Sequence, residues 1–169
     1  MISLPWRRST NASAINGIAL LKANHREIER WIEAFQLTTS TRRQLEIAFR
    51  ICEMVRAHIE IGQQIFYPAF LKATDADHRK CRAAAELRAM GKLIEEIERT
   101  SPSEDSYFPT THLLCEMFLH HVKQEEEVNG IFELARNARM DLEALGEHMR
   151  RRHPQPPVAA CLGRSRTMR

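Results

Sequence analysis

Residues 114–125 read LCEMFLHHVKQE, and apolar side chains recur in this stretch every three or four residues. That spacing keeps one face of an α-helix turned toward its neighbours in a fold. The members of this face are Leu114, Phe118, His121, Glu125, Val128 and Phe132. Two ionisable residues, His121 and Glu125, therefore occupy helix positions that we expect to be buried.

Two earlier segments repeat the pattern, and each places one histidine on its apolar face. The first face consists of Ile18, Leu21, His25, Ile28, Ile32 and Phe35. The second consists of Ile51, Val55, His58, Gly62 and Ile65. Burying such groups is costly unless they pair with one another or coordinate a metal ion. We therefore expect His25, His58, His121 and Glu125 to meet in one core, around a metal ion or as a polar network.

Length and composition indicate one soluble globular domain. A chain of 169 residues is long enough to bury a hydrophobic core, and 43% hydrophobic with 28% charged residues is ordinary for such a domain. The apolar runs are too short to span a bilayer. Residues 1–10 contain no apolar segment typical of an export signal, so we expect a cytoplasmic protein with no membrane partner.

The pattern predicts an all-α fold, because β-branched alternation is absent and glycine is scarce. Helices are expected at about 13–37, 41–67, 77–100, 106–137 and 141–151. Ser13 is a candidate cap for the first helix, and Pro68 is expected to end the second. Four long helices with short connections predict an antiparallel, up-down-up-down four-helix bundle. The short fifth helix is expected to pack across one end.

The chain divides into three predicted parts. Residues 1–12 form an N-terminal extension, residues 13–152 the bundle domain, and residues 153–169 a basic tail. The tail contains Pro154, Pro156 and Pro157, which cannot continue a helix, and lacks apolar periodicity. We therefore expect it to be disordered and solvated. Contact with nucleic acid is the less favoured interpretation of its arginines.

The cysteines are widely spaced and form no C-x-x-C pair, which favours free thiols. They are Cys52, Cys81, Cys115 and Cys161. An alternative is zinc held by His78 with Cys81 and by His112 with Cys115. Free thiols are favoured because structural zinc ligands usually cluster in short knuckles rather than mid-helix. No nucleophile triad, phosphate-binding glycine loop or acid–base carboxylate pair is found, so the sequence does not indicate an ordinary enzyme.

Four segments together resemble the hemerythrin HHE cation-binding domain. They are LLKANHR at 20–26, AHI at 57–59 with IFYP at 65–68, HHVKQEE at 120–126, and DLEALGE at 141–147. The resemblance covers about residues 14–150. It implies a four-helix bundle around a non-haem di-iron centre that binds or senses oxygen, iron or related small molecules. The positions that match the family's ligands are His25, His58, His121 and Glu125.

Two positions depart from the family pattern. Gly62 stands where the family has a bridging glutamate, and Leu87 where it has a further histidine. If the ligands divide as in the family, His25, His58 and Glu125 would serve one ion, and the other would keep only His121 and a share of Glu125.

One ion held by two imidazoles and a carboxylate suits ferrous iron with open positions, and zinc or manganese could compete for it. We therefore favour one iron ion, with two ions or none as alternatives. Without metal, the bundle would be a helical interaction or regulatory module with a buried polar network. His120 is predicted to flank the site, and Glu126 and Glu127 to form a solvated face.

Overall fold

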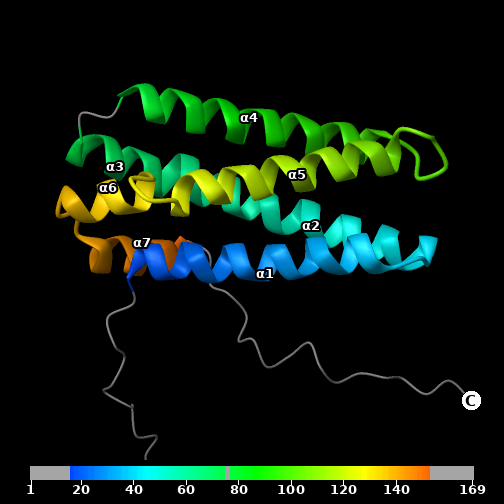
Figure 1. Ribbon diagram of the computed structural model, residues 1–169, viewed down its shortest axis with the longest axis horizontal. Coiled ribbons are helices and arrows are strands. Elements are labelled where there is room, and N and C mark those ends of the chain that lie inside the picture. Colours follow the sequence, from blue (N-terminus) through cyan, green and yellow to red (C-terminus); the bar gives the residue numbers. More distant parts are fainter. Residues whose placement is uncertain (1–15, 75–76, 153–169) are drawn as a thin grey trace, which may run out of the picture.

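The computed structural model describes residues 16–74 and 77–152, and within these ranges it contains helices and turns but no strand. The long helices are α1 (Gly17–Leu37), α2 (Thr41–Ile61), α4 (Asp77–Arg99) and α5 (Tyr107–Glu126). They lie side by side along the long axis of the molecule (Figure 1). The prediction of an all-α fold is confirmed, and the arrangement is consistent with a four-helix bundle.

The first helix begins later than predicted. The N-cap of α1 is Asn16, whose side chain accepts a hydrogen bond from the backbone N–H of Ile18 at 2.9 Å. The helix then continues without interruption to Leu37. The predicted extension at 1–12, the candidate cap Ser13 and the basic tail at 153–169 lie outside the described residues.

The prediction that Pro68 ends the second helix is wrong. A π-helical turn, η1 (Gly62–Phe66), follows α2 directly, and α3 (Tyr67–Ala73) follows η1. Pro68 lies in the first turn of α3, where its missing N–H is not needed for a helical hydrogen bond. The wider turn changes the register of the helix, so that Ile65, Phe66 and Tyr67 are buried in succession.

The fourth helix is also shorter than predicted, because the chain turns after α5 and starts again as α6 (Ile131–Asn137). Asn129 adopts a left-handed φ of 60°, a conformation that asparagine tolerates better than most residues. A Cβ at Gly130 would lie 2.7 Å from the Glu127 carbonyl oxygen, so the turn requires glycine there. Val128 is 82% exposed, which corrects its predicted place on the core face, whereas Phe132 is buried.

The last helix, α7 (Leu142–Arg152), packs alongside the first turns of α1 and against η1 (Figure 1). Asp141 caps it by accepting a hydrogen bond from the backbone N–H of Ala144 at 2.9 Å. Leu145 and Met149 are buried and form the inward face of this helix. The contact with α1 is close, since a Cβ at Gly17 would lie 3.1 Å from Leu145 Cγ.

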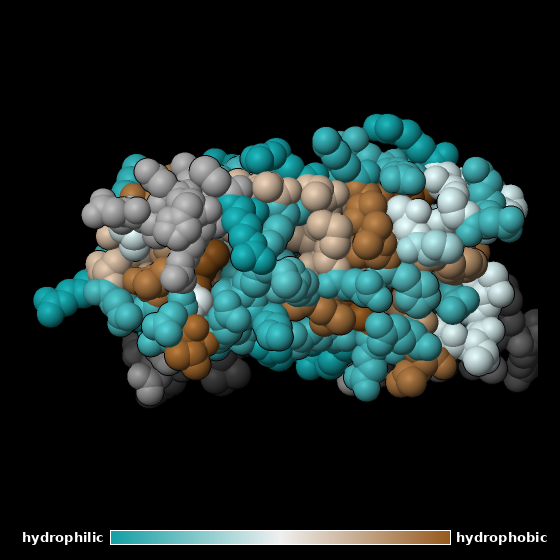
Figure 2. Space-filling model, turned by 45° about the horizontal axis from the view of Figure 1, so that its top comes forward, coloured by the Kyte–Doolittle hydropathy of each residue, from teal (hydrophilic) through white to brown (hydrophobic). Residues whose placement is uncertain are grey.

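The core is formed by the predicted inward faces of the helices. The inward face of α4 consists of five buried residues, namely Ala83, Leu87, Met90, Ile94 and Ile97. Figure 2 shows a face covered mainly by hydrophilic residues, with hydrophobic residues in separate groups. Within the described residues, no helix is both long enough and apolar enough to cross a membrane.

The two cysteines that the structure describes as free thiols are Cys52 and Cys115, and both are buried. His112 is exposed while Cys115 is not, so this pair does not present two ligands to one ion. The side chains of His78 and Cys81 lie outside the described part, as does Cys161. Burial raises the pKa of the Cys52 thiol to about 11 and that of Cys115 to about 12.

Cys52 and Cys115 are expected to resist thiol reagents at neutral pH, because only a thiolate reacts readily and burial disfavours it. The measurement is labelling of a Cys81→Ser/Cys161→Ser chain by a maleimide, in native buffer and in denaturant. We expect labelling of both thiols only in denaturant. Rapid labelling of the native chain would show that these cysteines are not held in the core.

Leu145→Ala is expected to destabilise the protein by about 2–4 kcal/mol, because it leaves a cavity between α7 and α1. Urea unfolding followed by circular dichroism measures the change. The control is His148→Ala on the exposed side of the same helix, which is expected to change stability by less than about 0.5 kcal/mol. Equal effects of the two substitutions would contradict the packing of α7 on α1.

Candidate metal centre

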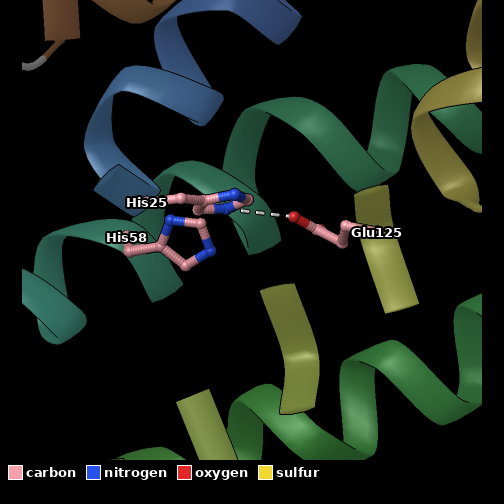
Figure 3. A group of neighbouring side chains, drawn as sticks. All are labelled: His25, His58 and Glu125. Carbon is pink, nitrogen blue, oxygen red and sulfur yellow. Dashed lines mark ion pairs between the residues drawn. The ribbon is translucent and has the colours of Figure 1, made fainter. Parts of the chain in front are cut away.

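The candidate site residues come from three different helices and meet in the core. His25 lies on α1, His58 on α2, and His121 and Glu125 on α5. Each is at most 2% exposed. His25, His58 and Glu125 each offer one ligand atom, and these three atoms lie within 4.8 Å of one another (Figure 3). The structure thus brings together the three residues that the resemblance assigns to one ion.

Two atoms of this group face each other without a hydrogen bond. His25 Nε2 and Glu125 Oε2 are both buried and lie 3.3 Å apart, yet neither atom has a hydrogen-bond partner. A buried polar atom left unpaired costs free energy comparable to a lost hydrogen bond. A cation between an imidazole lone pair and a carboxylate oxygen would satisfy both atoms, so the residues present fit a metal ion.

The outer nitrogens of His25 and His58 are held by oxygen atoms. His58 Nδ1 lies 3.0 Å from Asn24 Oδ1, and His25 Nδ1 lies 2.8 Å from Glu126 Oε1. Both oxygens can only accept, so each Nδ1 carries a proton and donates it. In the neutral ring this leaves the lone pair on Nε2, the arrangement by which outer residues orient metal-binding histidines.

His121 lies beside this group of three. Its Nε2 is 3.3 Å from His58 Nε2 and 3.5 Å from Glu125 Oε1. Its Nδ1 faces Glu86 Oε2 at 3.6 Å. His121 is therefore close enough to form an ion pair with Glu125 through one ring nitrogen, while the other ring nitrogen faces the Glu86 carboxylate of α4.

The electrostatics of the metal-free site favour an ionised Glu125. Burial raises the pKa of its carboxyl group, but the charge of His121 first, and then His25 and His58 close by, outweigh this and lower the pKa to about 2. Burial lowers the pKa of His121, but Glu125 and Glu86 raise it above its ordinary value overall. Burial and the neighbouring histidines lower the pKa of His58 well below its ordinary value. A protonated His121 thus balances the buried Glu125 anion.

The two departures from the family pattern lie next to each other. A Cβ at Gly62 would lie 3.0 Å from Leu87 Cδ1 and 3.4 Å from Tyr67 Cε2. Leu87 is fully buried and Tyr67 is 4% exposed. The leucine side chain and the phenol ring therefore fill the space beside Gly62, where a longer residue would otherwise extend.

Sequence reasoning missed several residues that support the site. The prediction that Glu126 belongs to a solvated face is wrong: besides His25, it pairs with Lys22 at 3.3 Å and with Arg26. Asn24 could have been found, because its spacing from Leu21 is that of an inward position. For Glu86, no spacing in the sequence indicates a place beside the site.

The predictions for the other polar neighbours hold. His120 is exposed and contacts Gln124, as expected of a residue that flanks the site. Glu127 is exposed as well, which is the solvated position predicted for it.

The comparisons with known proteins agree with this geometry. The model of the hemerythrin HHE cation-binding domain matches residues 16–135, from the cap of α1 into α6. The chain therefore belongs to the hemerythrin HHE cation-binding domain family, and this membership supports the binding of a metal cation. No curated protein and no solved structure shows significant similarity to the chain.

The free energy of unfolding of the metal-free protein is expected to be greatest near pH 6.5, the ordinary pKa of histidine. The pKa of His58 is lowered in the folded state, so its contribution to stability is present above pH 6.5 and is lost as pH falls below it. The pKa of His121 is raised in the folded state, so its contribution to stability is present below pH 6.5 and is lost as pH rises through the folded pKa. Each group changes stability by at most about 1.4 kcal/mol per pH unit.

Urea unfolding between about pH 5 and about pH 8 measures this profile. His58→Leu is expected to weaken the fall of the unfolding free energy below pH 6.5, because leucine cannot take up a proton. The fall of the unfolding free energy at higher pH is expected to remain. An unchanged acid side in this variant would show that His58 is not the group that titrates there.

Proposed function

We propose that this protein binds one non-haem iron ion through His25, His58 and Glu125, in the core of an antiparallel four-helix bundle. We further propose that it uses this ion in the cytoplasm to sense or bind iron, oxygen or a related small ligand. The observation that carries the proposal is the pair of unpartnered buried atoms, His25 Nε2 and Glu125 Oε2, beside the ring of His58.

The chemistry of these side chains suits iron. Ferrous iron accepts imidazole and carboxylate ligands together, and two imidazoles with one carboxylate leave positions open for an exogenous ligand. Asn24 and Glu126 orient the two rings, and the low pKa of Glu125 keeps its charge available at neutral pH. Zinc and manganese accept the same ligand types and are the expected competitors.

The residues around Gly62 support the binding of one ion rather than two. A second ion would have His121 and a share of Glu125, but no carboxylate from position 62 and no imidazole from position 87. The space beside Gly62 is filled by Leu87 and Tyr67 instead. A site that has lost two of its ligands loses affinity for its metal quickly.

Protein produced in iron-supplemented cells is expected to contain about one iron per chain, because His25, His58 and Glu125 make one complete ligand set. Elemental analysis measures it. His58→Ala and Glu125→Ala are each expected to reduce the iron content at least tenfold, while the matched control His120→Ala, an exposed histidine next to the site, is expected to retain it.

Iron near zero in the unsubstituted protein, with no binding of zinc or manganese, would contradict the proposal. Equal iron content in the unsubstituted protein and in His58→Ala would place the metal elsewhere.

A second candidate function is a metal-free helical module that binds another protein. It is favoured by the charge balance between Glu125 and a protonated His121, which makes the buried network tolerable without a cation. This alternative predicts that His25→Leu with Glu125→Leu leaves the stability of protein purified from iron-supplemented cells unchanged or raises it, because apolar replacement of a buried polar set is often tolerated.

The Gly62→Glu/Leu87→His variant is expected to raise the metal content toward two ions per chain, because it restores the two missing ligand types. The leucine that a Cβ at position 62 would approach is removed in the same variant. Elemental analysis and the near-ultraviolet absorption of oxo-bridged iron measure the gain. No gain in metal would mean that positions 62 and 87 do not face a second ion.

A further inference from the structure

The two oxygens of Glu125 have different partners. Tyr67 Oη donates a hydrogen bond to Glu125 Oε1 at 2.5 Å, and both residues are buried. Glu125 Oε2 has no hydrogen bond and faces His25 Nε2. A hydrogen bond from a hydroxyl group to a carboxylate is among the stronger ones in proteins, and burial makes its loss more costly. Oε2 is therefore the oxygen of Glu125 that has no hydrogen bond to give up when it meets a cation.

Tyr67 reaches Glu125 because of the π-helical turn that precedes it. The turn η1 (Gly62–Phe66) changes the register between α2 and α3, which places Tyr67 on the core side. The ring packs directly beside Gly62, where an added Cβ would be in contact with Tyr67 Cε2 at 3.4 Å. The same stretch of chain thus lacks a carboxylate at position 62 and provides a phenol at position 67.

We propose that Tyr67 is a positioning residue that confines Glu125 to one oxygen and thereby restricts the site to a single ion. A carboxylate that chelates one ion, or bridges two ions through separate oxygens, must present both oxygens to metal. Here Tyr67 holds Oε1 through its hydroxyl group, on the side where His121 Nε2 lies 3.5 Å away. This inference rests on the proposed function, because it concerns how the same site holds its metal.

Cobalt(II) is the probe, because the intensity of its visible ligand-field absorption falls as its coordination number rises. In Tyr67→Phe both oxygens of Glu125 are free, so we expect bound cobalt to gain a ligand and its absorption to weaken relative to the unsubstituted protein. The matched control is Tyr107→Phe, since Tyr107 is the other tyrosine of the chain and is also buried. This control is expected to keep the original spectrum.

The outcomes separate the inference from the proposed function. Identical cobalt spectra for the unsubstituted protein and Tyr67→Phe, both fully loaded, would overturn the role of Tyr67 and leave the metal site intact. Failure of the unsubstituted protein to bind cobalt, zinc or iron would overturn the proposed function and this inference with it. Circular dichroism verifies that each variant retains its helices.

A second measurement does not depend on the folding of Tyr67→Phe. In the Tyr107→Phe chain, Tyr67 is the sole tyrosine, so biosynthetic incorporation of a fluorinated, more acidic tyrosine alters this residue alone. A stronger donor withdraws more charge from Glu125, and we expect the dissociation constant for cobalt to rise. An unchanged constant would show that the phenol only fills space and would contradict the proposal.

Discussion

Burial of the Glu125 carboxylate determines how the polar residues in the core are arranged. A carboxylate at 2% exposure needs a countercharge and hydrogen-bond donors, and the core provides them from several elements. His25 and His121 lie within ion-pair distance, and Tyr67 donates to one oxygen. The other oxygen has no hydrogen-bond partner, and a cation bound there would satisfy it.

Regular and irregular helices both position residues of the candidate metal site. Regular α1, α2 and α5 place the three histidines and Glu125 at a common level, while the irregular η1 brings in Tyr67. The close approach of α7 to Gly17 covers the first turns of α1, next to the segment that carries His25. Outer partners such as Glu126 and Asn24 then fix which ring nitrogen faces inward.

Helical periodicity was sufficient to predict the all-α fold and the inward faces, including the burial of His25, His58, His121 and Glu125. It failed where the backbone departs from a regular helix. The prediction for Val128 is wrong because α5 ends at Glu126, where the backbone becomes extended at Glu127. The burial of Tyr67 depends on a π-helical turn that has no simple apolar period. The role of Glu126 was missed for a different reason. A glutamate within an acidic run is expected at the surface, and its contact with a buried ring is set by tertiary packing, which leaves its side chain only 16% exposed.

X-ray absorption of the iron-loaded protein is the decisive experiment, because it reports the ligands and the neighbours of the metal itself. The proposed single-ion site requires one iron surrounded by nitrogen and oxygen ligands, with the outer-shell scattering of imidazole rings and no second iron nearby. An iron neighbour at about 3.5–4 Å, the separation typical of two-metal sites, would contradict it. Iron without imidazole scattering would contradict it as well.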